Sequence, residues 1–343
     1  MHPKARNWTV AICSAALLCA VTACGGAAPN APTSDTPAHS AGLSVGIFVD
    51  DAFGDGDFMD QGGAAAAPLR GELGAKVTTY EGRLEAQNFE PLLRDAAGAN
   101  TLVFVLGFEA IDALKKVAHD SPGTTFVFVD GVVDGGDVVS ARFRTAEGCF
   151  MAGALAAVTR RAGQQPAATG FIGGVDAPVV RRCQAGFDQG VAKLAPGMRV
   201  LPQFVGSFTD PAKGKEIALS LAEQGAYAVF SYAGLSGAGG FDAAKAGAPI
   251  APIGVVADKS ALAPGKVPGS LTMRVDSVIL SLARSFAHGQ LRRGQTFDFG
   301  LADGGWRMVY DDHLVDPGTR ATLDGVQHQI EAGTLAVSDP GTG

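Results

Sequence analysis

The sequence predicts an α/β protein whose chain forms two lobes, each built around a parallel β-sheet. Short apolar runs alternate with longer amphipathic segments over most of the chain, as they do where parallel strands are joined by right-handed helical crossovers. The alternation breaks near residue 142 and again near residue 254, which indicates that the chain passes between two sheets. A length of 343 residues is also comfortable for two lobes.

The expected strands are short, continuous apolar runs, and the expected helices carry apolar residues along one face. In chain order, strands are expected at 43–49, 101–106, 125–129, 168–172, 226–232 and 253–256, and helices at 61–73, 110–120, 147–160, 179–194, 211–224 and 275–289. The helix at 211–224 has the clearest start, because Asp210 can cap it and Pro211 suits its first turn.

Composition and charge narrow the class of function. A chain that is 47% hydrophobic and 18% charged is typical of a packed globular protein. A net charge of -7 offers no basic face to replace the counterions of a nucleic acid, so nucleic-acid binding is not expected. The histidines are scattered and no HExxH or GxSxG motif occurs, which argues against an enzyme. No cofactor and no resident metal are expected.

The first residues have the features of a secretory signal. Lys4 and Arg6 precede an apolar stretch at 8–20, which is too short for a comfortable membrane span. Val21-Thr22-Ala23-Cys24 then resembles the lipobox of bacterial lipoproteins, which implies cleavage before Cys24 and a lipid on its thiol. The alternative is an ordinary cleaved signal with an incidental cysteine. We therefore expect a signal peptide at 1–23 and a lipid anchor on the extracytoplasmic face of the cell membrane.

Two further segments are expected to lack regular structure. Residues 24–42 are rich in Ala, Pro, Ser and Thr and read as a flexible tether, and 337–343 read as a disordered tail. Outside the signal and the anchor, the remaining cysteines are Cys149 and Cys183. A disulfide between them is permitted outside the cytoplasm, and two buried thiols are the alternative.

An acidic loop follows the first expected strand. It carries Asp50, Asp51, Asp55, Asp57 and Asp60. Because ligands dock outside the carboxyl ends of parallel strands, the loop predicts one wall of a binding cleft. Calcium is an alternative occupant, since closely spaced carboxylates are hard oxygen ligands, and a metal-dependent hydrolase using the loop from Asp50 to Asp60 is the corresponding alternative function. The loop lacks the spacing of an EF-hand and its terminal glutamate.

Two other segments are candidates for the cleft. Gly234-Leu-Ser-Gly-Ala-Gly-Gly follows an expected strand and opens a helix, so its backbone could approach a ligand, although tight turn packing explains it almost as well. It lacks the Lys and Ser/Thr of a P-loop. Phe208 lies where a strand gives way to the helix at 211–224, and it could stack on a planar ligand or cover a lobe interface.

From Val45 to about Gly305 the chain resembles the basic membrane protein family of lipoproteins, which includes purine-nucleoside receptors of bacterial ABC importers. The resemblance rests on ordered blocks: Gly107-Phe108 through Lys115-Lys116, Asp130-Gly131, Glu147-Gly148 with Ala152-Gly153-Ala154-Leu155, Gly170-Phe-Ile-Gly-Gly, Ala185-Gly186-Phe187, Val205-Gly-Ser-Phe-Thr-Asp-Pro-Ala-Lys-Gly-Lys, Leu262-Ala-Pro-Gly-Lys and Arg274-Val-Asp276. It implies a type I periplasmic-binding fold with a three-crossing hinge. Residues 43–141 plus 255–288 would form lobe 1, and 142–254 plus 289–336 lobe 2.

The resemblance also implies ligand-binding residues. Asp50 matches the first Asp after strand one, Asp112 matches the Asp expected to read the base edge, and Phe208 matches the Phe expected to cover one ring face. The family's stacking aromatic falls on Met59, and the Asn that follows it falls on Asp60.

Two departures affect the expected sugar contacts. The Asp that would grip ribose hydroxyls is Val256, and a Lys that joins the sugar contacts aligns with Met273. An unmade hydrogen bond in a closed cleft costs about 1 to 3 kcal/mol, so ribose recognition is in doubt. Asp60 for Asn and Met273 for Lys would each make the pocket one charge more acidic, which suits an amine or a cationic ring.

These observations predict the substrate-binding lipoprotein of an ABC importer. It would capture a nucleoside, nucleobase or related heterocycle between its lobes and deliver it to permease and ATPase partners, without chemistry of its own. A sensor that signals its closed state to a membrane partner is the alternative. The expected site residues are Asp50, Met59, Asp60, Asp112, Phe208, Gly234, Val256 and Met273.

Overall fold

The computed structural model describes residues 42–160 and 167–340. The expected signal peptide, the lipidation site Cys24 and the tether up to residue 41 lie outside the described residues, as do 341–343 at the C-terminus. In the part that is described, no helix is long and apolar enough to cross a membrane.

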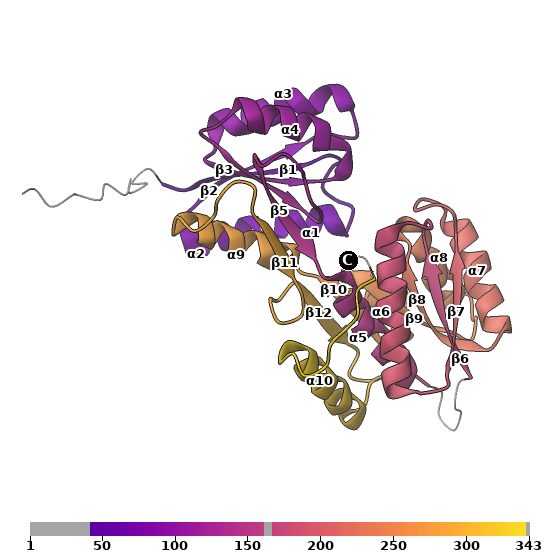
Figure 1. Cartoon of the computed structure of the whole chain (residues 1–343). Helices are drawn as coiled ribbons and strands as arrows, with labels where there is room; N and C mark the ends of the chain where they lie inside the picture. Colours follow the sequence, from indigo (N-terminus) through magenta and orange to yellow (C-terminus); the bar gives the residue numbers. More distant parts are fainter. Residues whose placement is uncertain (1–41, 161–166, 341–343) are drawn as a thin grey trace, which may run out of the picture. The chain divides into compact units, whose positions relative to one another are not determined.

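Two six-stranded sheets form the centres of two lobes (Figure 1). Lobe 1 has the strand order β11-β5-β4-β3-β1-β2, and lobe 2 has the order β12-β10-β9-β8-β6-β7. The strands of lobe 1 are β1 (Ser44–Val49), β2 (Lys76–Glu81), β3 (Leu102–Leu106), β4 (Thr125–Val129), β5 (Val138–Phe143) and β11 (Thr296–Phe299). Those of lobe 2 are β6 (Ala168–Gly173), β7 (Arg199–Phe204), β8 (Ala226–Tyr232), β9 (Ala251–Val256), β10 (Gly269–Met273) and β12 (Trp306–Tyr310). Only β12 runs antiparallel to its neighbour among the paired strands described.

Helices cover both faces of the lobe 1 sheet (Figure 1). One face packs against α3 (Ala86–Ala99) and α4 (Ile111–Asp120), and the other against α1 (Phe58–Ala64), α2 (Ala66–Leu73) and α9 (Val275–Ala287). Because side chains alternate along a strand, β1 supplies both cores. Ile47 belongs to one apolar cluster, and the next residue, Phe48, belongs to the other.

Lobe 2 has the same three-layer arrangement. Its helices are α5 (Thr145–Val158) and α6 (Pro178–Leu194) on one face, α7 (Pro211–Glu223) and α8 (Ala238–Lys245) on the other, and α10 (Pro317–Glu331), which packs on α5. α5 and α6 approach closely through glycines, since a Cβ at Gly186 would lie 2.1 Å from the backbone oxygen of Ala146. Cys149 and Cys183 join these two helices by a disulfide, so the thiol alternative is wrong.

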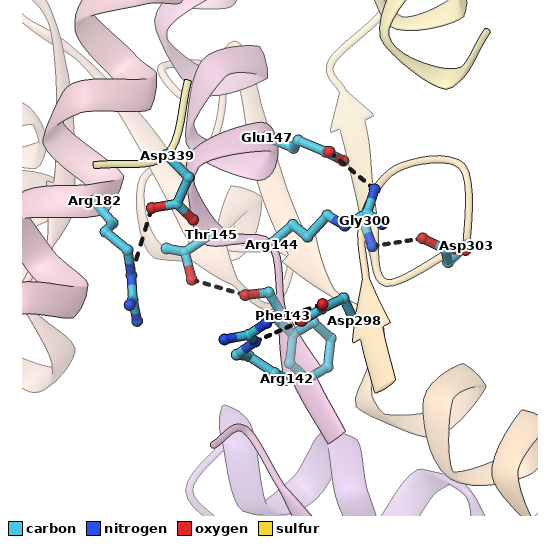
Figure 2. A network of polar contacts seen from close by, with 10 residues as sticks. All are labelled: Arg142, Phe143, Arg144, Thr145, Glu147, Arg182, Asp298, Gly300, Asp303 and Asp339. Atoms are coloured by element: carbon cyan, nitrogen blue, oxygen red, sulfur yellow. Dashed lines mark hydrogen bonds and ion pairs between the residues drawn. The ribbon is translucent and has the colours of Figure 1, made fainter. Parts of the chain in front are cut away.

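The chain crosses between the lobes three times, after β5, after β10 and after β11, which confirms the expected hinge. Figure 2 shows how the first and third crossings are tied together. Arg142 makes a two-pronged ion pair with Asp298 at 2.5 and 2.9 Å, and Glu147 accepts a hydrogen bond from the backbone of Leu301 at 3.2 Å. The second crossing joins them where the Arg274 N–H donates to the oxygen of Gly305 at 2.8 Å.

The lobe limits differ from those expected at 255–288 and 289–336. β10 pairs with β9 in the second sheet, so residues 255–273 belong to lobe 2, whereas β11 pairs with β5 and brings 296–299 into lobe 1. The physical reason is long-range: pairing between strands decides sheet membership, and that pairing has no local pattern in the sequence.

The expected disordered tail at 337–343 is also corrected for its first residues. Ser338 and Gln189 exchange two hydrogen bonds of 2.8 and 2.9 Å, and Asp339 forms an ion pair with Arg182 at 3.9 Å (Figure 2). These polar contacts hold 337–340 against α6 despite the lack of an apolar pattern.

Candidate ligand-binding cleft

The cleft lies where the strand order of each sheet reverses. In lobe 1, β1 is flanked by β2 and β3, and in lobe 2, β6 is flanked by β7 and β8. Such reversals open a crevice at the carboxyl ends of the strands, because the two crossovers leave on opposite faces of the sheet. Asp50 and Gly107 from lobe 1 and Tyr232 from lobe 2 all line one cleft of about 970 Å³.

Six of the eight expected site residues line this cleft. They are Asp50, Met59, Phe208, Gly234, Val256 and Met273. Asp60 and Asp112 are not among its lining residues. The carboxylate of Asp60 turns back and accepts the backbone N–H groups of Gly54 and Gly56 at 2.7 and 2.8 Å, and Asp112 is exposed on α4. Neither is placed to read a ligand, and Asp60 does not make the cleft more acidic as expected.

Asp50 both lines the cleft and holds the turn after β3. It is 1% exposed, and its Oδ2 accepts the backbone N–H of Glu109 at 3.2 Å. Burial, and then a hydrogen bond with the Glu109 side chain, raises the pKa of Asp50 to about 7. Gly107 has φ of +108°, and a Cβ there would lie 1.8 Å from the Asp50 carboxyl carbon. The turn therefore needs glycine to accommodate this carboxyl group.

The other aspartates of the acidic loop are used mainly by the loop itself. Asp55 accepts the backbone N–H groups of Asp57, Met59 and Asp60 at 2.8 to 3.1 Å, which starts α1. Asp57 forms an ion pair with Lys259 of lobe 2 at 3.2 Å. Across residues 42–160 and 167–340, no group of three or more His, Cys, Asp or Glu side chains is arranged to hold a metal ion.

The wall from lobe 2 is aromatic and apolar. Phe208 is 39% exposed and rests on Gly174, where a Cβ would lie 2.2 Å from its ring. Ser236 fixes the same loop, because its hydroxyl accepts the Asp210 N–H at 2.8 Å and its own N–H donates to the oxygen of Phe208 at 3.0 Å. A Cβ added at Gly234 would lie 3.1 Å from the backbone oxygen of Phe208, so the glycine-rich segment allows tight packing around Phe208.

The two positions that depart from the sugar-binding pattern are both in the cleft. Val256 has φ of +68°, a left-handed conformation that is rare for a β-branched residue. Met273 ends β10 and is 2% exposed. Strained backbone is found most often at functional sites, so the conformation of Val256 is further reason to place a binding site here.

Several lining residues were not expected from the sequence. They are Phe108, Glu109, Asp130, Arg142, Arg182, Tyr232, Asp258 and Lys259. The sequence could have indicated Asp130, because this residue directly follows the expected strand at 125–129, just as Asp50 follows the expected strand at 43–49. It could not have indicated Arg182, since this is one of several polar residues on a long helix and only tertiary packing turns it toward the cleft.

Comparisons with known proteins agree with this geometry. The sequence model of a family described as "ABC transporter substrate-binding protein PnrA-like" matches residues 43–335. Basic membrane protein D of Borreliella burgdorferi (strain JD1) is 30% identical over 292 residues, which cover 82% of this chain and 83% of that protein. The ABC transporter nucleoside-binding protein BmpA of Lactococcus lactis subsp. cremoris is 32% identical over 249 residues, which cover 67% and 70%.

Solved structures support the fold. An ABC transporter solute-binding protein from Conexibacter woesei superposes with a TM-score of 0.72 at 22% identity and covers 87% of this chain and 99% of that one. One from Aeropyrum pernix K1 gives 0.70 at 23% identity, with 87% and 94% covered. These neighbours share the type I periplasmic-binding fold. The chain is a solute-binding protein and not an enzyme, and it belongs to the PnrA-like family of ABC transporter substrate-binding proteins.

Proposed function

We propose that this chain is a lipid-anchored, extracytoplasmic receptor that captures a nucleoside, nucleobase or related heterocycle in the cleft and presents it to a permease with its ATPase. The observation that carries the proposal is the exposed ring of Phe208, held by Gly174 at the carboxyl ends of the lobe 2 strands. Met59 and Phe108 bring further polarisable and aromatic surface from lobe 1. Flat heterocycles bind well to such surfaces. A relative of this chain is named as nucleoside-binding.

Capture requires no bond making. A ligand that contacts residues of both lobes favours the closed arrangement, because only that arrangement offers all of its contacts at once. The described hinge suits this role, since three short crossings lie side by side and are tied by Arg142–Asp298 and by the Arg274 backbone. The permease would then recognise the closed pair of lobes.

The ligand class is tested by isothermal titration with purines, pyrimidines and their nucleosides. We expect at least one heterocycle to bind. We also expect the ribose to add little affinity, because Val256 and Met273 offer no hydrogen bonds to a diol. If none of these compounds gives a heat of binding, the proposed ligand class is wrong. A strong preference for nucleosides over bases would contradict the expectation that ribose adds little affinity.

The proposed anchor is tested through Cys24, which lies outside the described residues. Replacing it by Ala should leave the full-length precursor without a lipid, and the protein should move from the membrane fraction to the soluble fraction or remain as unprocessed precursor. Cys19→Ala, in the preceding segment, is the matched control and should leave fractionation unchanged. Membrane association of Cys24→Ala with normal processing would argue against lipidation at this residue.

A further inference from the structure

Asp130 lies at the carboxyl end of β4 with its carboxylate on the cleft. Its backbone has φ of +75°, and the Asp130 and Gly131 N–H groups both donate to the oxygen of Ala141, at 2.8 and 3.2 Å. These bonds hold the residue in an uncommon conformation that Asp tolerates better than most side chains. Its side chain lines the same cleft as Phe208 and Met59.

The carboxylate of Asp130 differs from the other carboxylates around it. Asp50 accepts the Glu109 N–H, Asp55 accepts backbone N–H groups of its own loop, and Asp57 is paired with Lys259. Asp258, on the opposite wall, accepts the Ser260 N–H at 2.9 Å. Asp130 makes no hydrogen bond through its side chain to any residue at 42–160 or 167–340. It therefore retains the capacity to accept hydrogen bonds from a ligand.

Two groups of lobe 2 face Asp130 in the cleft. Burial raises the pKa of Asp130 to about 7, and the Arg182 guanidinium on α6 partly opposes that rise. Burial and the nearby Asp130 raise the pKa of the Tyr232 phenol. Arg182 is also shared with Asp339 at 3.9 Å, so it is not a dedicated partner of Asp130 (Figure 2). A desolvated carboxylate without a hydrogen-bonded partner is costly, and a donor on a bound ligand would remove that cost.

The surroundings of Asp130 are largely apolar. Large apolar side chains are left exposed along the cleft from both lobes, namely Phe108, Val132, Phe208, Leu235 and Leu262. Exposed apolar surface gathered in one concave place marks a binding site. Phe108 is held with its ring edge-on to Phe128, with ring centres 5.8 Å apart, so this surface is partly fixed in advance.

We propose that Asp130 is a ligand-binding and specificity-determining residue, which accepts hydrogen bonds from a nitrogen donor on an otherwise aromatic or apolar ligand. The donor is an amine, an amidine or a ring N–H. The inference rests on the proposed function for the place of the ligand, but it adds the chemical group that the ligand must carry and the residue that reads it.

The test compares probes that differ in this donor. Adenine is paired with 9-methylpurine, which has neither the exocyclic amine nor a ring N–H, and benzamidine is paired with methyl benzoate, which has no N–H group. Binding of each is measured to the wild type, to Asp130→Asn and to Asp134→Asn. Asn keeps the shape of Asp and tolerates positive φ. Asp134 is an exposed carboxylate of the same loop that does not line the cleft, which makes it a matched control.

We expect the donor-bearing member of at least one pair to bind more tightly. Asp130→Asn should weaken that binding by about 10- to 100-fold, as loss of a charge-assisted hydrogen bond does, and Asp134→Asn should leave it unchanged. The proposal is overturned if Asp130→Asn binds as the wild type does, if the donor-free probes bind equally well, or if no probe binds. Binding of benzamidine that depends on Asp130, with silence from every heterocycle, would overturn the proposed ligand class and uphold this inference. Heterocycle binding that is unchanged in Asp130→Asn would uphold the proposed ligand class and overturn this inference.

Discussion

Asp50 links the folding of lobe 1 to pH. Its carboxyl group is buried, with a pKa of about 7, so between about pH 4 and pH 7 the folded state keeps a proton that the unfolded chain has lost. The free energy of unfolding must then fall as the pH rises through this window. Asp130 acts in the same direction, because burial raises its pKa as well. The carboxyl groups with lowered pKa values, such as Asp298, act only at lower pH.

We expect the wild type to be more stable at pH 5 than at pH 7.5, and Asp50→Asn to show a weaker fall over that range. Each raised carboxyl can contribute at most about 1.4 kcal/mol per pH unit. Urea unfolding at a series of pH values measures the slope. Asp95→Asn, at an exposed position on α3, is the control and should keep the wild-type slope. A slope unaltered by Asp50→Asn would mean that Asp50 is ionised in the folded protein.

Val256 lines the cleft at the position where the family resemblance implies an Asp that binds ribose hydroxyls, so we expect that a ribose contact can be introduced there. Asp occupies the left-handed region more readily than Val, so Val256→Asp should relieve backbone strain of about 1 kcal/mol. The new carboxylate should also accept hydrogen bonds from the hydroxyl groups of a ribose diol. This should raise the affinity for a nucleoside, relative to that for its base, by about tenfold. Val256→Gly relieves the strain without adding an acceptor, so it should gain stability alone. If titration gives the same ratio of nucleoside affinity to base affinity in the wild type and in Val256→Asp, this expectation is wrong.

The site residues could be predicted from sequence only in part. Asp50 directly follows β1 and Val256 is the last residue of β9, and the rule that ligands meet the carboxyl ends of strands places both in the cleft. Asp60 carries the same carboxylate in the first turn of α1, but there it accepts hydrogen bonds from the nearby N–H groups of Gly54 and Gly56. Which acceptor takes a backbone donor depends on loop geometry, and residue type alone does not reveal it.

Among the elements, six of the eight central strands were predicted, whereas the four edge strands and two central strands, β5 and β10, were not. β4 and β8 have the expected limits, because a central strand is covered on both faces and reads as a continuous apolar run. β2 and β7 lie at sheet edges, with partly exposed side chains and mixed sequences such as Lys76-Val-Thr-Thr-Tyr-Glu81, so neither was expected. β11 is four residues long and was missed for a related reason, since most of its side chains are not fully buried.

The disulfide between α5 and α6 should contribute strongly to stability. It closes a loop between positions 34 residues apart, for which chain entropy predicts about 3 to 4 kcal/mol. We expect the free energy of unfolding of the Cys149→Ala/Cys183→Ala double variant to be lower by this amount, so that it unfolds at a lower denaturant concentration. The variant should still bind any ligand of the wild type, because neither cysteine lines the cleft. The variant should be insensitive to reductant, and the wild type should approach it when reduced. Identical unfolding of reduced and oxidised wild type would show that the bond adds nothing.

At the scale of the whole molecule, the sequence indicated two lobes but not every crossing. The break in the alternation near residue 142 lies where the structure has its first crossing, from β5 to α5. β9 and β10 look locally the same whichever sheet they join, and it is the pairing of β10 with β9 and β12 that assigns β10 to lobe 2. Interactions between residues far apart in the chain thus set the architecture beyond what periodicity can show.

One ion pair joins the two lobes across the cleft. Lys259, after β9 in lobe 2, lies 3.2 Å from Asp57 in the acidic loop of lobe 1, and its Nζ also donates to the oxygen of Gly56 at 3.4 Å. Both side chains are largely buried, and Asp57 Oδ1 has no partner among the described residues. Burial raises the pKa of Asp57 and Lys259 lowers it. The pair therefore favours the arrangement in which the lobes are close together.

Removing Lys259 should loosen this arrangement in the absence of ligand. In Lys259→Met, Asp57 would remain desolvated without its cation, so the lobes should separate to hydrate it, and the radius of gyration from small-angle X-ray scattering should increase. Any ligand that requires closed lobes should then bind more weakly, because a smaller fraction of the ligand-free molecules is closed and part of the binding free energy is used to close the rest. Lys213→Met, which breaks an exposed ion pair with Glu216 within lobe 2, is the control and should alter neither quantity.

The double variant Asp57→Asn/Lys259→Met decides whether the effect comes from the pair. With the buried charge removed as well, the ligand-free radius should return toward that of the wild type, and the cycle of single and double variants should give a coupling free energy of about 1 kcal/mol or more. If Lys259→Met expands the molecule and the double variant expands it equally, Lys259 acts through the hydrogen bond of its Nζ to the oxygen of Gly56 rather than through Asp57. If neither variant changes the radius, the hinge ties at Arg142 and Arg274 set the lobe arrangement without help from the cleft.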